Sequence, residues 1–267
     1  MPSTNRNNVR IGGAGPATIV FAHGFGCDSK MWRRLAPLFE DRFRTVVFDL
    51  VGSGGSDLAA YDRRKYGSLR GYADDLVEML DELEMGPVIF VGHSVSAMIG
   101  LLASIEAPAR FRAQVLVGSS PCYVNDLDYV GGFSRDEIDG LLETLETNYL
   151  GWSSTMAPAF MGAPEQPELG AELADSLSRN DPDIARHFAR VTFLADHRAD
   201  LCKSTVPALI LQSREDLVVP GEVAHYLHRH VPNSSLELVD NIGHYPHLSA
   251  SADCLRAIDT FLLRTLS

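Results

Sequence analysis

The stretch from residue 88 to residue 104 constrains the fold more than any other part of the chain. Residues 88–91 form a short, continuously apolar run, as in a strand that is buried on both faces of a sheet. A turn of small residues with the letters GHSVS follows at once, and residues 97–104 are apolar enough for a buried helix. A strand that passes through a tight turn straight into a helix is typical of parallel α/β sheets.

Similar apolar runs recur on both sides of this stretch. A helix is predicted at residues 71–84, where large apolar residues recur at helical spacing. The alternation of strands and helices predicts a mostly parallel central sheet with helices on both faces. Further strands are predicted at residues 19–22, 45–48, 114–117, 208–212 and 236–239, and further helices at residues 221–230 and 252–266.

The middle of the chain departs from this alternation. Residues 135–149, 169–178 and 183–194 have helical patterns, and no convincing strand lies among them. A helical block inside a parallel sheet indicates an inserted cap. We therefore predict that residues 1–133 form the first part of the core, residues 134–199 the helical cap, and residues 200–267 the second part of the core.

Ser94 stands at the turn between the apolar strand and the helix that follows it. This is the position of a nucleophile elbow, whose strained backbone requires small neighbours. Gly92 supplies the first small residue, but the second is Ser96, so the chain departs from the pattern G-x-S-x-G. The alternative is that Ser94 only caps the helix. That alternative leaves the acid and the histidine described next unexplained.

A serine hydroxyl needs a base to take its proton, and the base needs an acid to orient it. After a nucleophile elbow, the acid and then the base follow later strands. Asp216 follows a late predicted strand and His244 follows the last one, with Glu215 as the alternative acid. The rival histidines are less well placed: His225, His228 and His230 lie on or at the end of a predicted helix, His187 and His197 lie in the cap, and His247 lies three residues beyond His244. This order predicts an α/β-hydrolase fold with Ser94, Asp216 and His244 as its catalytic triad.

Acyl transfer also needs donors for the negative charge that develops on a carbonyl oxygen. In this fold one backbone N–H comes from the residue after the nucleophile, here Val95. The other comes from the loop after the first central strand, which has the letters HGFG, and Phe25 is the best candidate. The alternative for HGFG is a plain glycine turn.

Charge and cysteine content limit the partners. The chain of 267 residues has 35 acidic and 23 basic side chains, for a formal net charge of −12. Nucleic-acid binding depends on basic contacts to phosphate, so we expect no nucleic-acid partner. The cysteines lack the spacing of a metal site and are predicted to be free thiols in a reducing compartment. They are Cys27, Cys122, Cys202 and Cys254.

Other classes of site and location find no support in the sequence. The first 16 residues lack the apolar core of a signal peptide, and no apolar run reaches the roughly 18 residues that a membrane span needs. The letters GSGGS at residues 52–56 lack the lysine and the helix of a phosphate-binding loop. We therefore expect a cytoplasmic monomer that uses no cofactor, metal or membrane.

Longer stretches of the sequence are more specific than these motifs. They include HGFGCDSKMW, FDLVGSGGSD, GHSVSAMIG, VGSSPCYVND, GGFSRDEIDGLL, NYLGW, DPDIARHFAR, DHRADL and GHYPHLS. On these stretches the chain resembles the group that contains the bacterial sigma-B regulator RsbQ and the plant karrikin and strigolactone receptors. The resemblance covers residues 22–262, including the cap.

This resemblance implies an α/β-hydrolase core with a four-helix cap, or lid, inserted after the sixth strand. It also implies a deep apolar pocket that leads down to Ser94, as would suit a small hydrophobic ligand. By position, the resemblance points to pocket-lining side chains at Phe25, Tyr123, Phe133, Trp152, Met156, Thr192, Phe193 and Val218.

Two functional hypotheses follow. The first is a serine hydrolase that cleaves a small hydrophobic ester or lactone. The second is a signalling module of the RsbQ or karrikin-receptor type, which binds or slowly hydrolyses a small ligand and acts through a protein partner. Dehalogenation and epoxide opening use a carboxylate at the elbow, so Ser94 argues against both. A haloperoxidase-like reaction stays open, because fold alone does not fix function.

Overall fold

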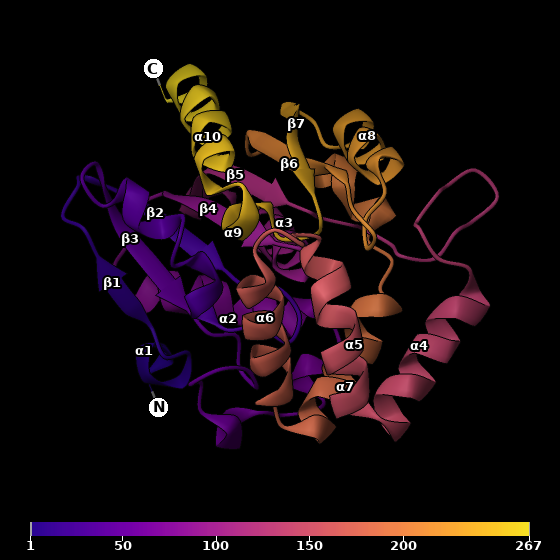
Figure 1. Cartoon of the computed structure of the whole chain (residues 1–267). Coiled ribbons are helices and arrows are strands. Elements are labelled where there is room, and N and C mark those ends of the chain that lie inside the picture. Colours follow the sequence, from indigo (N-terminus) through magenta and orange to yellow (C-terminus); the bar gives the residue numbers. More distant parts are fainter. Residues whose placement is uncertain (1, 267) are drawn as a thin grey trace.

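A seven-stranded sheet forms the centre of the computed structural model, which describes residues 2–266 (Figure 1). The strands follow the order β1-β3-β2-β4-β5-β6-β7 across the sheet. Among these strands all neighbours are parallel except β1 and β3, so the mostly parallel sheet is confirmed. The strands are β1 Arg10–Gly12, β2 Ala17–Ala22, β3 Phe43–Phe48, β4 Val88–His93, β5 Phe111–Val117, β6 Ala208–Glu215 and β7 Ser234–Ile242.

Helices cover both faces of this sheet. Successive side chains on a strand point to opposite faces. Phe21 and Val91 accordingly pack with α10 on one face, whereas Val20 and Phe90 pack with α2 and α3 on the other. Both faces are apolar, which explains why β4 is buried along its whole length. The helices outside the cap are α1 Ser3–Arg6, α2 Leu69–Glu82, α3 Val95–Glu106, α8 Gly221–His230, α9 Pro246–Ser249 and α10 Ser251–Thr265.

Four α-helices lie between β5 and β6, and they gather at the lower right of Figure 1, away from α10. They are α4 Arg135–Thr147, α5 Tyr149–Met161, α6 Pro167–Ser178 and α7 Pro182–Phe193. Helix α4 begins with a capping box in which Ser134 and Glu137 satisfy each other's backbone N–H groups. Asp181 caps α7 in front of a proline at the first helical position.

Two features of the cap differ from the sequence analysis. Five described strands precede the cap rather than six, because the chain before β1 forms the short helix α1 and not a further strand. Helix α5 has no counterpart among the helical stretches found by periodicity, since Gly151 and Pro158 weaken its pattern. The division into core and cap at residues 134 and 199 stays a prediction.

A buried histidine on α9 joins the core to the end of β4. His247 is fully buried, and its ring lies 4.4 Å from the ring of Trp32 and 4.5 Å from that of His93. Burial, with the charges of His244 and Arg33, lowers the pKa of His247 to about 3. Burial and the neighbouring histidines also hold the pKa of His93 well below its usual range. Both rings are therefore neutral near pH 7.

We predict that acid destabilises the protein partly through His247. An unfolded histidine binds a proton near pH 6.5, whereas the folded His247 binds one only near pH 3. The unfolded state therefore binds more protons between these values, and the free energy of unfolding falls as the pH drops below about 6.5. From pH 7 to pH 5.5 His247 should contribute a loss of about 1 kcal/mol. Denaturant unfolding at the two pH values should show that His247→Phe loses less free energy of unfolding than the wild type, by this amount.

His225 provides the control, since it is an exposed histidine on α8. The variant His225→Gln should lose as much stability on acidification as the wild type. An equal loss in His247→Phe and the wild type would contradict the prediction.

Candidate active site

Ser94 lies at a sharp turn between β4 and α3. Its backbone has φ 55° and ψ −121°, a region that residues with a side chain rarely adopt. The turn is tight enough that a Cβ on Gly92 would lie 2.7 Å from the backbone nitrogen of Ala97. The Ser94 N–H donates to the carbonyl of Val117 on β5 at 2.8 Å, which holds the turn against the sheet. This geometry is that of a nucleophile elbow.

Three residues that are far apart in the sequence form one hydrogen-bonded chain. The Ser94 Oγ lies 2.9 Å from Nε2 of His244, and Nδ1 of His244 lies 2.8 Å from Oδ2 of Asp216. Each residue comes at or just after the carboxyl end of a strand: β4 for Ser94, β6 for Asp216 and β7 for His244. Because parallel strands end at the same edge of the sheet, the fold brings the three together.

Asp216 is held as a buried carboxylate. Its Oδ1 accepts the backbone N–H groups of Val218 and Val219, and its Oδ2 accepts Nε2–H of Gln212. Burial alone would raise the pKa of Asp216, but His244 and the two backbone donors outweigh burial and hold the pKa below its usual range. An ionised Asp216 fixes the proton of His244 on Nδ1 and leaves Nε2 free to accept one. Glu215, the alternative acid, is exposed.

The backbone of His244 is held from two sides. Its N–H donates to the carbonyl of Phe160 on α5 at 2.7 Å, so the cap reaches the loop after β7. Its carbonyl accepts Nε2–H of the buried His93 at 2.8 Å. The chain also passes close to α5, since a Cβ on Gly243 would lie 2.0 Å from the carbonyl oxygen of Met161. The imidazole is therefore oriented by contacts with both the core and the cap.

The predicted oxyanion donors lie on either side of Ser94. Val95 is the first residue of α3, and Phe25 belongs to the loop after β2. This loop lies against the elbow, because a Cβ on Gly24 would stand 3.3 Å from Cβ of Ser94. The N-terminus of α3 adds a positive dipole end beside Ser94. The role of the two N–H groups in binding an oxyanion stays a prediction.

Ser96 makes a link that the sequence did not reveal. Its side chain is fully buried, and its Oγ–H donates to the carbonyl of His23 at 2.5 Å. This hydrogen bond joins the first turn of α3 to the loop that carries Phe25. A glycine at the second small position of the elbow would lack the link. The departure from G-x-S-x-G therefore has a structural counterpart in this chain.

A small cavity of about 30 Å³ lies beside Ser94 and His244. Six of the eight predicted pocket residues line it, namely Phe25, Tyr123, Trp152, Thr192, Phe193 and Val218. Phe160, Leu177 and Tyr245 also line it and were not singled out in the sequence. The lining is mostly aromatic, and the ring of Phe25 contacts those of Trp152 and Phe193.

Phe133 and Met156 do not line this cavity. The backbone of Phe133 pairs with Tyr123 and Asn125 across the loop that precedes α4, which fixes it at the base of that loop. Met156 is half-buried on α5 and packs against the main apolar core. The cap side chains that line the cavity are those of Trp152 and Phe160 on α5, Leu177 on α6, and Thr192 and Phe193 on α7.

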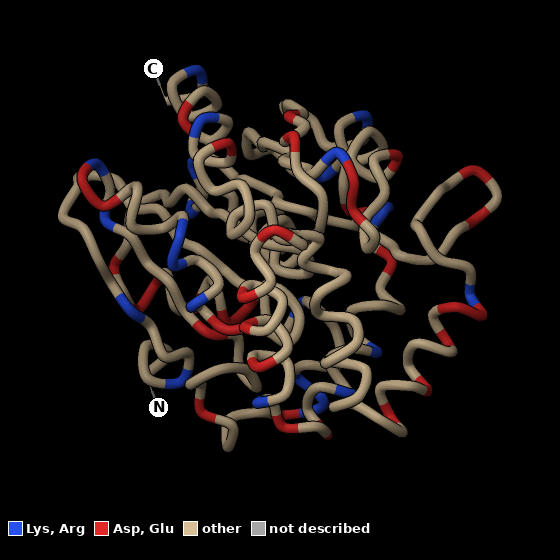
Figure 2. The backbone as a smooth tube through the Cα atoms, in the orientation of Figure 1, with Lys and Arg blue, Asp and Glu red and all other residues tan. Residues whose placement is uncertain are grey.

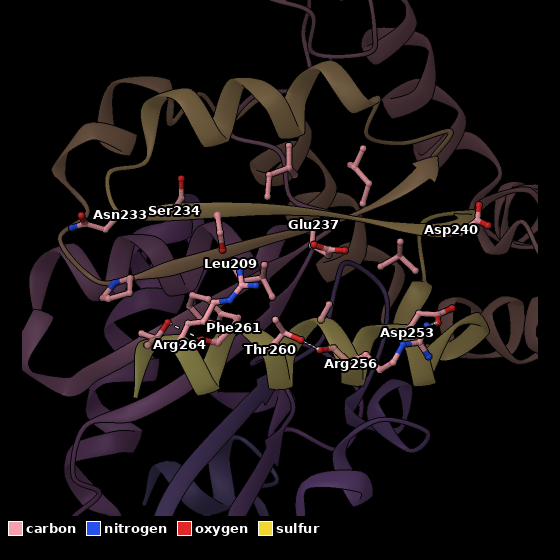
Figure 3. Close-up of a pocket in the computed structure, with 17 residues that line it drawn as sticks. Leu209, Asn233, Ser234, Glu237, Asp240, Asp253, Arg256, Thr260, Phe261 and Arg264 are labelled. Atoms are coloured by element: carbon pink, nitrogen blue, oxygen red, sulfur yellow. Dashed lines mark hydrogen bonds and ion pairs between the residues drawn. The ribbon is translucent and has the colours of Figure 1, made fainter. Parts of the chain in front are cut away.

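Figure 3 shows a larger groove of about 820 Å³ between α10 and the strands β6 and β7. Leu209 and Phe261 form part of its apolar floor, and Glu237, Arg256 and Arg264 lie along it. None of the triad residues lines this groove. The larger groove is therefore not the candidate active site. The small cavity at the carboxyl edge of the sheet remains the candidate, because it contains Ser94 and His244.

Other kinds of site are not seen in residues 2–266. No group of three or more histidine, cysteine or acidic side chains there is placed to hold a metal ion. No helix in this part of the chain is long and apolar enough to cross a membrane. None of the four cysteines, Cys27, Cys122, Cys202 and Cys254, forms a disulfide.

Comparison with known proteins agrees with this geometry. Residues 19–257 match the alpha/beta hydrolase family, and the chain belongs to that family. The expected fold class is thereby confirmed.

Within the family, the chain is 41% identical over 245 residues to the karrikin insensitive 2 receptor CA of Petunia hybrida, covering 91% of each chain. It is 38% identical over 260 residues to the strigolactone esterase D14 of Arabidopsis thaliana, covering 97% of this chain and 96% of the relative. A solved structure of a hydrolase from Oleispira antarctica superposes with a TM-score of 0.95 at 41% identity, covering 98% of this chain and 96% of the other. The resemblance to the receptor group is confirmed, and these relatives support a hydrolase activity.

We predict that Ser96→Ala lowers ester hydrolysis mainly through kcat. Loss of one oxyanion donor typically lowers kcat by about 10²–10³-fold. Loosening the loop that carries such a donor should cost less, about 10-fold, with little change in KM. Steady-state kinetics on a p-nitrophenyl ester measures both constants.

Ser104→Ala is the matched control, because Ser104 is an equally buried serine on α3 whose hydroxyl donates to the carbonyl of Leu101. This variant should keep the wild-type kcat. A kcat for Ser96→Ala equal to that of Ser104→Ala would show that the link to His23 has no part in turnover.

Proposed function

We propose that this protein is a serine hydrolase that cleaves a small hydrophobic ester or lactone through an acyl-enzyme intermediate. The observation that carries the proposal is the hydrogen-bonded chain from Ser94 through His244 to Asp216. The proposed reaction needs no cofactor, because the serine oxygen is the nucleophile and the imidazole moves the protons.

In the first half of the reaction, the Ser94 Oγ attacks the carbonyl carbon while its proton passes to Nε2 of His244. The carbonyl oxygen becomes an oxyanion, which the backbone N–H groups of Phe25 and Val95 stabilise. Asp216 stabilises the imidazolium through Nδ1–H. The tetrahedral intermediate then collapses, and the alcohol oxygen leaves with the proton from Nε2.

In the second half, water attacks the acyl carbon and gives its proton to Nε2 of His244. Collapse of the second intermediate returns that proton to Oγ of Ser94 and releases the acid. For a lactone, the alcohol and acyl parts remain one molecule, so the product is a single hydroxy acid. Neutral rings at His93 and His247 suit this cycle, because they add no charge beside His244.

The cavity supports a small, mainly apolar substrate. Its walls are aromatic and aliphatic, with few polar groups besides the triad. A volume of about 30 Å³ has room for little more than a water molecule. Substrate binding therefore requires side chains of α5, α6 or α7 to move outward, and long or branched substrates should be excluded.

A signalling role through a protein partner is the second candidate. It is favoured by the similarity to the Petunia receptor and by the small volume of the cavity. Of the large hydrophobic side chains on the four described cap helices, only Leu150 is strongly exposed, at 60%. Acidic residues recur along α4 instead, as Figure 2 shows. A partner that docked on this helix would therefore carry a basic surface.

We predict that the wild type hydrolyses p-nitrophenyl acetate or a simple butenolide lactone and that Ser94→Ala does not. Removing the nucleophile should lower kcat by at least about 10³-fold, since the remaining binding groups give only residual catalysis. Intact mass spectrometry during turnover should show an acyl adduct on the wild type and none on Ser94→Ala.

Equal activity in the two proteins would overturn the serine mechanism. A wild type that forms one covalent adduct and then stops would instead favour the signalling candidate.

A further inference from the structure

Thr192 lines the active-site cavity and carries a buried hydroxyl without a partner. The residue lies in the last turn of α7 and is 98% buried, with an exposed fraction of 2%. Its Oγ1 has no hydrogen-bond partner. A threonine in a helix can donate to the carbonyl four residues earlier, but this one does not do so. Buried polar groups are nearly always paired, so an unpaired one in a ligand cavity calls for an explanation.

Tyr123 adds a second hydroxyl to the same wall. Its side chain is buried, and its oxygen lies 3.5 Å from Oγ of Ser94, which is long for a hydrogen bond between two hydroxyls. Burial raises the pKa of Tyr123 to about 12, so the phenol keeps its proton and can donate. Both residues thus line a mainly aromatic cavity. The Thr192 hydroxyl has no partner there, and the Tyr123 hydroxyl has only the long contact with Ser94.

The scissile group of an ester does not need these hydroxyls. Its carbonyl oxygen would be bound by the N–H groups of Phe25 and Val95, and its leaving oxygen would take a proton from His244. A donor elsewhere in an apolar wall is satisfied only by a further polar atom of the ligand or by trapped water. A purely hydrocarbon acyl group would leave Oγ1 of Thr192 unpaired.

We infer that Thr192 is a specificity-determining residue that donates a hydrogen bond to a second oxygen of the substrate, beyond the scissile ester or lactone group. The substrate class is then a compact ester or lactone with an additional ether or carbonyl oxygen close to the reacting carbonyl. This inference rests on the proposed function. Tyr123 is the neighbouring donor for the same polar end of the ligand.

The test compares esters that differ only by an oxygen in place of a methylene. One pair is p-nitrophenyl methoxyacetate and p-nitrophenyl butyrate, and the second is p-nitrophenyl 3-methoxypropionate and p-nitrophenyl pentanoate. Both members of a pair have the same leaving group and nearly the same size. The ratio of their kcat/KM values, compared between variants, cancels the intrinsic reactivity of each ester and the fraction of active protein.

Thr192→Val removes the hydroxyl and keeps the shape of the side chain, whereas Thr192→Ser keeps the hydroxyl. In at least one pair, Thr192→Val should lower the kcat/KM for the ether ester, relative to that for its hydrocarbon counterpart, by about 10-fold or more. The reason is that a buried donor discriminates strongly against a ligand that lacks its partner. Thr192→Ser should keep the ratio within about 3-fold of the wild type. Thr45→Val is the control, because Thr45 is a buried threonine on β3 whose hydroxyl donates to Glu40.

An unchanged ratio in Thr192→Val for both pairs would overturn the inference and assign Thr192 to packing alone. If the wild type hydrolyses none of the esters, the proposed function fails separately. Binding then decides the role of Thr192, with methyl methoxyacetate and methyl butyrate titrated against Ser94→Ala and against Ser94→Ala with Thr192→Val. A selective loss of about 10-fold for the ether ligand supports the inference. Equal loss for both ligands, or no binding of either, overturns it.

Discussion

The sharp turn of the backbone at Ser94 is the constraint on which the rest of the site depends. A residue other than glycine with a positive φ is costly, and it persists only where its surroundings enforce that conformation. Here the enforcement comes from the sheet, through the hydrogen bond from the Ser94 N–H to Val117, and from close packing at Gly92. The site needs room as well. Gly118, just after β5, supplies it, since a Cβ there would lie 3.2 Å from the ring of His244.

The remaining members of the triad depend on the same edge of the sheet. Asp216 and His244 follow neighbouring strands, so the parallel pairing of β6 and β7 places both at the same edge of the sheet. Local hydrogen bonds then refine the arrangement. Two backbone N–H groups donate to the carboxylate of Asp216, His93 donates to the carbonyl of His244, and the His244 N–H donates to the carbonyl of Phe160. The cap narrows the cavity, because the rings of Trp152, Phe188 and Phe193 pack against the ring of Phe25.

Much of this architecture could be predicted from the sequence because it rests on local signals. Apolar runs such as residues 88–91 fix the buried strands, and chain order alone is enough to nominate Asp216 and His244. The features that escaped prediction depend on contacts between distant segments. Nothing near Ser96 shows that its hydroxyl meets the carbonyl of His23, and nothing in α5 shows that Phe160 reaches the cavity. Helix α5 itself is stabilised by packing on α6 in spite of its glycine and proline.

The hydrogen bond between the His244 N–H and the carbonyl of Phe160 joins the loop of the proposed base, His244, to the cap. Any outward movement of the end of α5 must either break this bond or carry the loop of His244 with it. Binding of a ligand in the cavity and the orientation of the His244 imidazole are therefore coupled through the end of α5. Movement of this part of the cap should therefore change the orientation of the His244 imidazole.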